Sequence, residues 1–199
     1  RGRHLEAMRS SGLRILSERG DVTLDSVDVT AGPMGGPPAD FVIFTVKGQD
    51  TKSAAALIAP IVGSDTAIVS FQNGVEWLDI LSDAFSQDAV MPGSTMTPAV
   101  IEAPGVIRHV GRSRPIIIGE WRGAETERVR RFAHWCEKAG LDVTVSENIL
   151  ESIWSKFVGM TTMSALTCLT RLPVRTVVTT AETRHLANAA MDEIIAVAR

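Results

Sequence analysis

The sequence predicts an α/β protein in which a doubly wound parallel sheet is followed by helices. Two apolar runs, residues 41–46 and 66–70, have the length and composition of buried parallel strands. Each is followed by a helix-like segment, at residues 51–59 and 75–85. This alternation is typical of doubly wound sheets. From residue 148 onward the pattern is mainly helical, which predicts a second unit.

Composition excludes several classes of protein. The 199 residues are 45% hydrophobic and 22% charged, as in ordinary soluble proteins, and the net charge of -3 offers no basic surface for nucleic acid. No apolar run reaches the roughly 18 residues that a membrane span needs, and we expect no signal peptide. Cys136 and Cys168 lack metal or disulfide spacing, which favours a reducing cytoplasm. Because the chain begins with Arg1 and its last helical pattern reaches Arg199, we expect both ends to be cut.

The first forty residues contain short elements and one loop. Residues 4–11 predict a short helix, and residues 13–16 and 22–29 predict half-buried strands. Residues 31–39 are rich in glycine, but their prolines remove the amide donors that a phosphate-binding loop needs. We therefore expect a surface turn there, not a P-loop or a dinucleotide fingerprint.

Two polar residues follow the two predicted parallel strands. Lys47 comes after the first strand, and Asn73 lies in the turn after the second. Ligands of doubly wound sheets bind beyond the carboxyl ends of the strands. We therefore expect Lys47 and Asn73 to lie at the ligand-binding edge.

The later elements complete the predicted sheet and begin the helical unit. Residues 89–120 are broken by prolines and glycines, which indicates an antiparallel extension. A helix at residues 124–139 ends at Gly140, and residues 141–145 form the last strand. Asn148 and Glu151 form a capping-box pattern for a helix that ends near Pro173, before another at residues 180–199. These boundaries predict two domains, residues 1–146 and 147–199.

A lysine lies within the apolar stripe of the helix after Asn148. Five residues fall within about 60° of Lys156 on a helical wheel: Ile149, Ile153, Met160, Met163 and Thr167. No charge occurs from residue 157 to residue 170, so we expect most of this helix to be enclosed. A buried lysine is rare without a partner or a function, although a long side chain can also reach water. Because the stripe continues on both sides of Lys156, we favour a functional lysine.

Other chemistry-bearing residues show no motif. The four histidines lack metal-ligand spacing and are expected at the surface, and no GxSxG elbow is present. Trp121 and Trp135 are interpreted as packing residues.

Four stretches in order carry a resemblance to a known family: RGRHLEAM at residues 1–8, DFVIFTVK at 40–47, FQNGV at 71–75 and IWSKF at 153–157. Residues 103–109 and 116–119 add support. The chain resembles the ketopantoate reductases (2-dehydropantoate 2-reductases) over nearly its whole length. The resemblance implies a Rossmann-type domain followed by the start of an all-helical domain. It also implies NADPH-dependent reduction of a 2-oxo acid, ketopantoate, in pantothenate and coenzyme A biosynthesis.

The resemblance also implies roles for individual residues. Lys156 matches the proton donor to the substrate carbonyl, and Asn73 matches a residue that holds cofactor and substrate. Lys47 matches a cofactor contact, Arg1 the arginine that binds the NADPH 2′-phosphate, and Ala99 a backbone contact to the cofactor. General chemistry agrees with the role of Lys156, because an ammonium stabilises the oxyanion that develops during carbonyl reduction. Burial also lowers the pKa of a lysine and makes it a better acid.

The chain departs from the family pattern in three places. It lacks the glycine-rich first strand and turn, and it lacks the later helical part with a serine and a glutamate of the active site. Met160, Ser164 and Val174 stand where the family has asparagines. We therefore expect Asn73, Lys156, Met160 and Ser164 to form an unusually apolar substrate pocket. The fragment itself is expected to be inactive and to bind NADPH poorly.

Two alternatives stay open. One is a catalytically silent relative that binds a nucleotide or a protein. The other is a two-domain dehydrogenase of the 3-hydroxyacid type, although the segment around Lys156 favours the reductase. A homodimer is left open, while no membrane or nucleic-acid partner is expected.

Overall fold

The computed structural model describes residues 1–32, 36–112, 115–123 and 125–198. Its main sheet has the strand order β3-β4-β5-β8-β9. The strands β3, β4 and β5 are parallel, β8 is antiparallel to β5, and β9 is parallel to β8. The predicted α/β fold is confirmed, but the sheet is mixed, because β8 returns beside β5 without the crossover helix that a parallel pair requires. The strands are β3 (Phe41–Phe44), β4 (Ala67–Ser70), β5 (Val90–Thr95), β8 (Pro115–Ile118) and β9 (Asp142–Val145).

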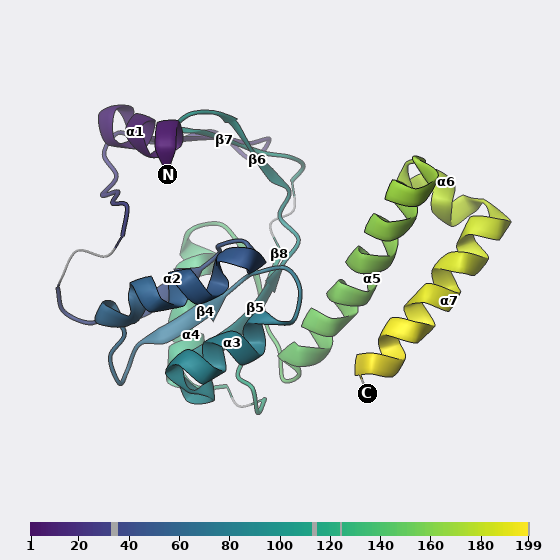
Figure 1. Ribbon diagram of the computed structural model, residues 1–199. Coiled ribbons are helices and arrows are strands. Elements are labelled where there is room, and N and C mark those ends of the chain that lie inside the picture. Colours follow the sequence, from purple (N-terminus) through teal and green to yellow (C-terminus); the bar gives the residue numbers. More distant parts are fainter. Residues whose placement is uncertain (33–35, 113–114, 124, 199) are drawn as a thin grey trace.

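Helices cover both faces of this sheet (Figure 1). Ile68 and Val90 belong to the core beneath α2 and α3, whereas Val69 and Met91 belong to the core beneath α4. Successive strand residues point to opposite faces, so a strand buried on both faces must be apolar throughout. This explains the apolar run of β4, all of which is buried. The helices are α2 (Thr51–Ile58), α3 (Trp77–Phe85) and α4 (Glu127–Lys138).

The strand β3 differs from its prediction. It ends at Phe44, and only Phe44 is buried, whereas Ile43 is 59% exposed. Within the described part of the chain, β3 pairs with β4 alone and forms an edge of the sheet. The expectation of a buried strand over residues 41–46 was therefore wrong, because an apolar run does not reveal how many neighbours a strand has.

A second sheet, of order β2-β1-β7-β6, lies beside α1 (Gly2–Ser11) (Figure 1). The predicted strand 22–29 forms only at residues 22–24, because its pairing with β1 ends at Leu13 and Leu24. The predicted antiparallel extension is divided, with β6 and β7 in this sheet and β8 in the main one. His109 is buried and lies 3.0 Å from the Ser17 hydroxyl, so its expected surface position was wrong. The strands are β1 (Leu13–Leu16), β2 (Val22–Leu24), β6 (Ala99–Ala103) and β7 (Val106–His109).

Three helices follow the main sheet: α5 (Ile149–Thr170), α6 (Val174–Thr179) and α7 (Ala181–Ala198) (Figure 1). The predicted cap is present, since Asn148 Oδ1 accepts a hydrogen bond from the Glu151 amide at 3.4 Å. The side chains also meet, with Asn148 Nδ2 donating to Glu151 Oε2 at 2.9 Å. The short helix α6 was not predicted, and its N-cap residue is Pro173, which has no side-chain cap hydrogen bond.

The helix α5 is less enclosed than its composition suggests. Ile149 and Ile153 join the core beneath α2 and α3, but Met160 is 39% exposed. The second half of α5 buries Thr162 and Leu166 instead, on the face that packs against α7. On the C-terminal side of Lys156 the stripe leaves the core of the main sheet, and Met163 packs instead against the small cluster around Leu166. Among the described helices, none is long and apolar enough to cross a membrane.

Candidate active site

A cavity of about 750 Å³ opens at the carboxyl edge of the main sheet. Its wall consists of the segments that follow β3, β4 and β5, together with two residues of α5, Lys156 and Met160. Parallel strands end at the same edge, so their following loops converge there. Lys47 and Asn73 both line this cavity, and the predicted convergence of the two residues is confirmed.

Lys156 crosses from α5 to the end of β5. Its Nζ donates a hydrogen bond to the backbone carbonyl of Thr95 at 2.6 Å. The Thr95 hydroxyl donates in turn to the carbonyl of Pro115 on β8, at 2.9 Å. Burial lowers the pKa of Lys156 below its ordinary value, because desolvation disfavours the charged form. Lys156 is thus a half-buried ammonium with one fixed acceptor and further protons to donate.

A smaller cavity of about 300 Å³ adjoins Lys156 between α5 and the turn after β4. Asn73, Met160 and Ser164 line it, so three of the predicted substrate residues meet Lys156 here. Ile153 and Phe157 supply further apolar wall. The cavity therefore combines an ammonium, an amide and a hydroxyl with a mostly apolar surface.

Three other predicted residues lie elsewhere. Arg1 is exposed and pairs with Asp50 at 2.9 Å, in the 3-10 turn η1 (Gly48–Asp50) that follows Lys47. Ala99 begins β6, directly after the cavity residue Pro98. Val174 begins α6. Within the described residues, none of the three belongs to the lining of the two cavities.

The charges around the larger cavity have one sign. Among its described lining residues are two lysines, Lys47 and Lys156, and no aspartate or glutamate. Lys47 and Asn73 are both exposed, and neither side chain makes a hydrogen bond to another described residue. The cavity therefore offers unused donors and positive charge, which suit a ligand that carries carboxylate or phosphate groups.

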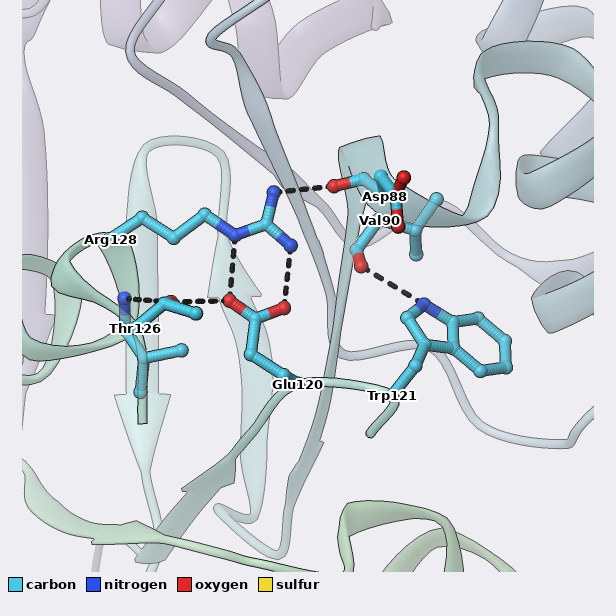
Figure 2. A network of polar contacts seen from close by, with 7 residues as sticks. Asp88, Val90, Glu120, Trp121, Thr126 and Arg128 are labelled. Atoms are coloured by element: carbon cyan, nitrogen blue, oxygen red, sulfur yellow. Dashed lines mark hydrogen bonds and ion pairs between the residues drawn. The ribbon is translucent and has the colours of Figure 1, made fainter. Parts of the chain in front are cut away.

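An ion pair between the buried Glu120 and the half-buried Arg128 lies at the opposite end of β5 (Figure 2). Glu120 accepts hydrogen bonds from Arg128 at 2.5 and 2.7 Å and from Thr126 at 2.5 Å. Arg128 also donates to the carbonyl of Asp88, and Trp121 donates to that of Val90. Burial opposes ionisation of Glu120, but the hydrogen bonds from Arg128 and Thr126 outweigh it and lower the pKa of the carboxyl. The network holds the start of β5, whose other end carries Thr95.

Sequence reasoning missed this network, the Thr95 carbonyl and the buried side chain of Gln72. The turn after β4 was predicted, but nothing in its composition separates the inward Gln72 from the outward Asn73. Among the described residues, no group of three or more His, Cys, Asp or Glu side chains could hold a metal.

A mixed α/β sheet with a cavity at its carboxyl edge, closed by a lysine-bearing helix, is the arrangement in which Rossmann-type folds bind their ligands. Comparison with known families supports a fold of this type. The family model described as ketopantoate reductase PanE/ApbA matches residues 1–123, and that of its C-terminal part matches residues 148–199. The chain belongs to the ketopantoate reductase family, as its sequence motifs predicted.

Comparisons with individual relatives agree with this family assignment. The chain is 33% identical over 217 aligned residues to a 2-dehydropantoate 2-reductase of Mesorhizobium japonicum, covering 99% of this chain and 66% of the relative. It is 28% identical over 199 residues to the uncharacterized oxidoreductase YkpB of Bacillus subtilis, covering 100% of this chain and 65% of that protein. The crystal structure of 2-dehydropantoate 2-reductase from Geobacter metallireducens matches with a TM-score of 0.87 and 29% identity, over 97% of this chain and 64% of that one. The chain thus spans about two thirds of the length of these relatives.

Proposed function

We propose that the complete protein reduces a 2-oxo acid to a 2-hydroxy acid with NADPH, as a 2-dehydropantoate 2-reductase-like enzyme. The observation that carries the proposal is the half-buried Lys156 ammonium, facing the cavity where Lys47 and Asn73 meet. The relative from Mesorhizobium japonicum bears the name of this activity. In this proposal residues 1–146 form the dinucleotide-binding domain and residues 147–199 begin the helical domain.

The cavity residues suit both ligands. Exposed donors on Lys47 and Asn73, without a carboxylate in the described lining, fit the anionic and amide groups of a dinucleotide. The cofactor supplies the hydride when it is bound. Arg1, beside η1, would bind the 2′-phosphate with its guanidinium, and Ala99 would offer its backbone. Asn73 would hold cofactor and substrate together.

Lys156 supplies the proton in this mechanism. Negative charge develops on the carbonyl oxygen as the carbonyl carbon is reduced, and a nearby ammonium stabilises that charge. The lowered pKa makes Nζ a better acid toward the oxygen. The hydrogen bond to the Thr95 carbonyl holds the ammonium at the cavity wall. Met160 and Ser164 would contact the substrate side chain.

A cofactor assay tests the proposal directly. The complete gene product should oxidise NADPH in the presence of one or more 2-oxo acids, and faster than it oxidises NADH. Arg1→Ala should weaken the binding of NADPH more than the binding of NADH. If the complete gene product oxidised NADPH with none of the 2-oxo acids, the proposal would be contradicted. If Arg1→Ala lost the same affinity for NADPH and for NADH, Arg1 would not bind the 2′-phosphate.

A further inference from the structure

The turn after β4 contains a buried amide behind the exposed Asn73. Gln72 is 6% exposed, and its Nε2 donates to the Val46 carbonyl at 2.8 Å and to the Thr51 hydroxyl at 2.9 Å. The orientation of the amide follows from its partners, because the Val46 carbonyl can only accept a hydrogen bond. Both protons of the Gln72 amide are therefore used inside the protein, so Gln72 has none left for a ligand.

The two bonds converge on the segment around Lys47. Val46 precedes Lys47, and Gly48 follows it. Gln72 holds the Val46 carbonyl directly, and Thr51, which is fully buried, donates its own proton to the Gly48 carbonyl at 2.8 Å. The backbone on both sides of Lys47 is thus fixed by one amide and one hydroxyl. Linked hydrogen bonds of this kind also polarise and strengthen one another.

We infer that Gln72 is a positioning residue that holds Lys47 and Asn73 in one fixed arrangement for the dinucleotide. The inference rests on the proposed function, because it assigns the fixed arrangement to cofactor binding. Gln72 is adjacent to Asn73 in the chain and clamps the segment around Lys47. Lys47 has no ion-pair partner among the described residues, so its own side chain does not fix that segment.

Gln72 and Thr51, whose hydrogen bonds hold the backbone on both sides of Lys47, are here called the clamp. Variants of these two residues test the inference in the complete gene product. Gln72→Met keeps the size of the side chain but removes both donors, and we expect the Kd for NADPH to rise about tenfold. Thr51→Val removes the hydrogen bond from the Thr51 hydroxyl to the Gly48 carbonyl and should also raise the Kd for NADPH. Thr51→Ser keeps the hydroxyl and should bind NADPH like the wild type. If Gln72 and Thr51 only stabilised the fold, Gln72→Met and Thr51→Val would lower the melting temperature and leave the Kd for NADPH unchanged, which would contradict the inference. The matched control is Thr162→Val, which changes a buried hydroxyl outside both cavities.

Amide hydrogen exchange without cofactor supplies an independent readout. Residues 45–50 and 71–74 should exchange faster in Gln72→Met, while β4 and β5 keep their protection. If Gln72→Met does not fold, the contrast between Thr51→Val and Thr51→Ser decides in its place. Folded clamp variants with wild-type exchange and wild-type Kd would overturn the inference. A wild-type protein that binds no NADPH would contradict the proposed function, but exchange would still show whether the clamp exists.

Discussion

The ammonium of Lys156 lies 2.6 Å from the backbone carbonyl of Thr95, so the helix α5 is bonded to the end of the strand β5. This bond joins the helical part of the chain to the sheet at the wall of the cavity. It also explains how a lysine tolerates partial burial, since one of its protons is satisfied by the protein. Because Lys156 also lines the cavity, its remaining protons are available to a ligand there.

The lowered pKa of Lys156 predicts a limit to activity at high pH. A proton donor must be protonated, so kcat/KM should fall as the pH rises through the lysine pKa, which lies below the ordinary 10.5. Lys156→Arg is the control, because a guanidinium does not titrate in this range. Any residual activity of that variant should lack the alkaline fall. If kcat/KM fell in the same way at high pH in the wild type and in Lys156→Arg, a group other than Lys156 would cause the fall.

A second prediction concerns the substrate. Met160 offers no hydrogen bond to a substrate hydroxyl, and an unpaired buried hydroxyl costs roughly 1–3 kcal/mol. The complete enzyme should therefore prefer 2-oxo acids with aliphatic side chains to ketopantoate, by about tenfold to a hundredfold in kcat/KM. Met160→Asn should shift the preference toward ketopantoate, whereas Met160→Leu should not. Ketopantoate as the best substrate of the wild type by a wide margin would exclude this role of Met160.

The ion pair of Glu120 and Arg128 predicts a large loss of stability on mutation. Glu120→Gln leaves the half-buried Arg128 without its charged partner, and the loss of hydrogen bonds between charged groups costs about 1.5–3 kcal/mol. The folded-state pKa of Glu120 is below its ordinary 4.5, so its stabilisation is present above that value and is lost as the pH falls. Denaturant unfolding at pH 7 and pH 3 measures both effects. The wild type and Glu120→Gln should differ less at pH 3, and equal differences at the two pH values would contradict the charge argument.

Thr162 predicts a stabilising substitution. Its hydroxyl is buried on α5 and has no hydrogen-bond partner among the described residues. Thr162→Val keeps the shape and removes the unpaired hydroxyl, which should raise the free energy of unfolding by about 1 kcal/mol. Thr167→Val is the comparison, because the Thr167 hydroxyl donates to the Met163 carbonyl at 2.7 Å. A loss of stability in Thr162→Val equal to that in Thr167→Val would show that the Thr162 hydroxyl is paired.

Local sequence patterns predicted the elements whose causes are local. The buried strand β4, the capped start of α5 and Gly140 at the end of α4 follow from composition and from neighbouring residues. The meeting of Lys47 and Asn73 could be predicted because parallel strands share a carboxyl edge. The roles of these residues in binding remain predictions.

The pairing of strands that lie far apart in the chain could not be predicted from the sequence. Nothing in residues 99–109 indicates that β6 and β7 join β1 in a separate sheet, since the partners are about ninety residues apart. The acceptor for Lys156 is a backbone carbonyl, which every residue possesses. Gln72 became recognisable only once its burial and its two acceptors were known.

The Lys156→Met variant of the complete gene product tests the central claim most directly. Methionine removes the proton donor and also the cost of burying a charge, which the lowered pKa of Lys156 reveals. Turnover of NADPH with the best 2-oxo acid should fall by about 10²–10⁴-fold, the usual contribution of general acid catalysis. The protein should stay folded with a melting temperature close to that of the wild type, because removing the buried charge offsets the lost hydrogen bond to the Thr95 carbonyl. A stable variant with wild-type turnover would contradict the assignment of Lys156 as the proton donor.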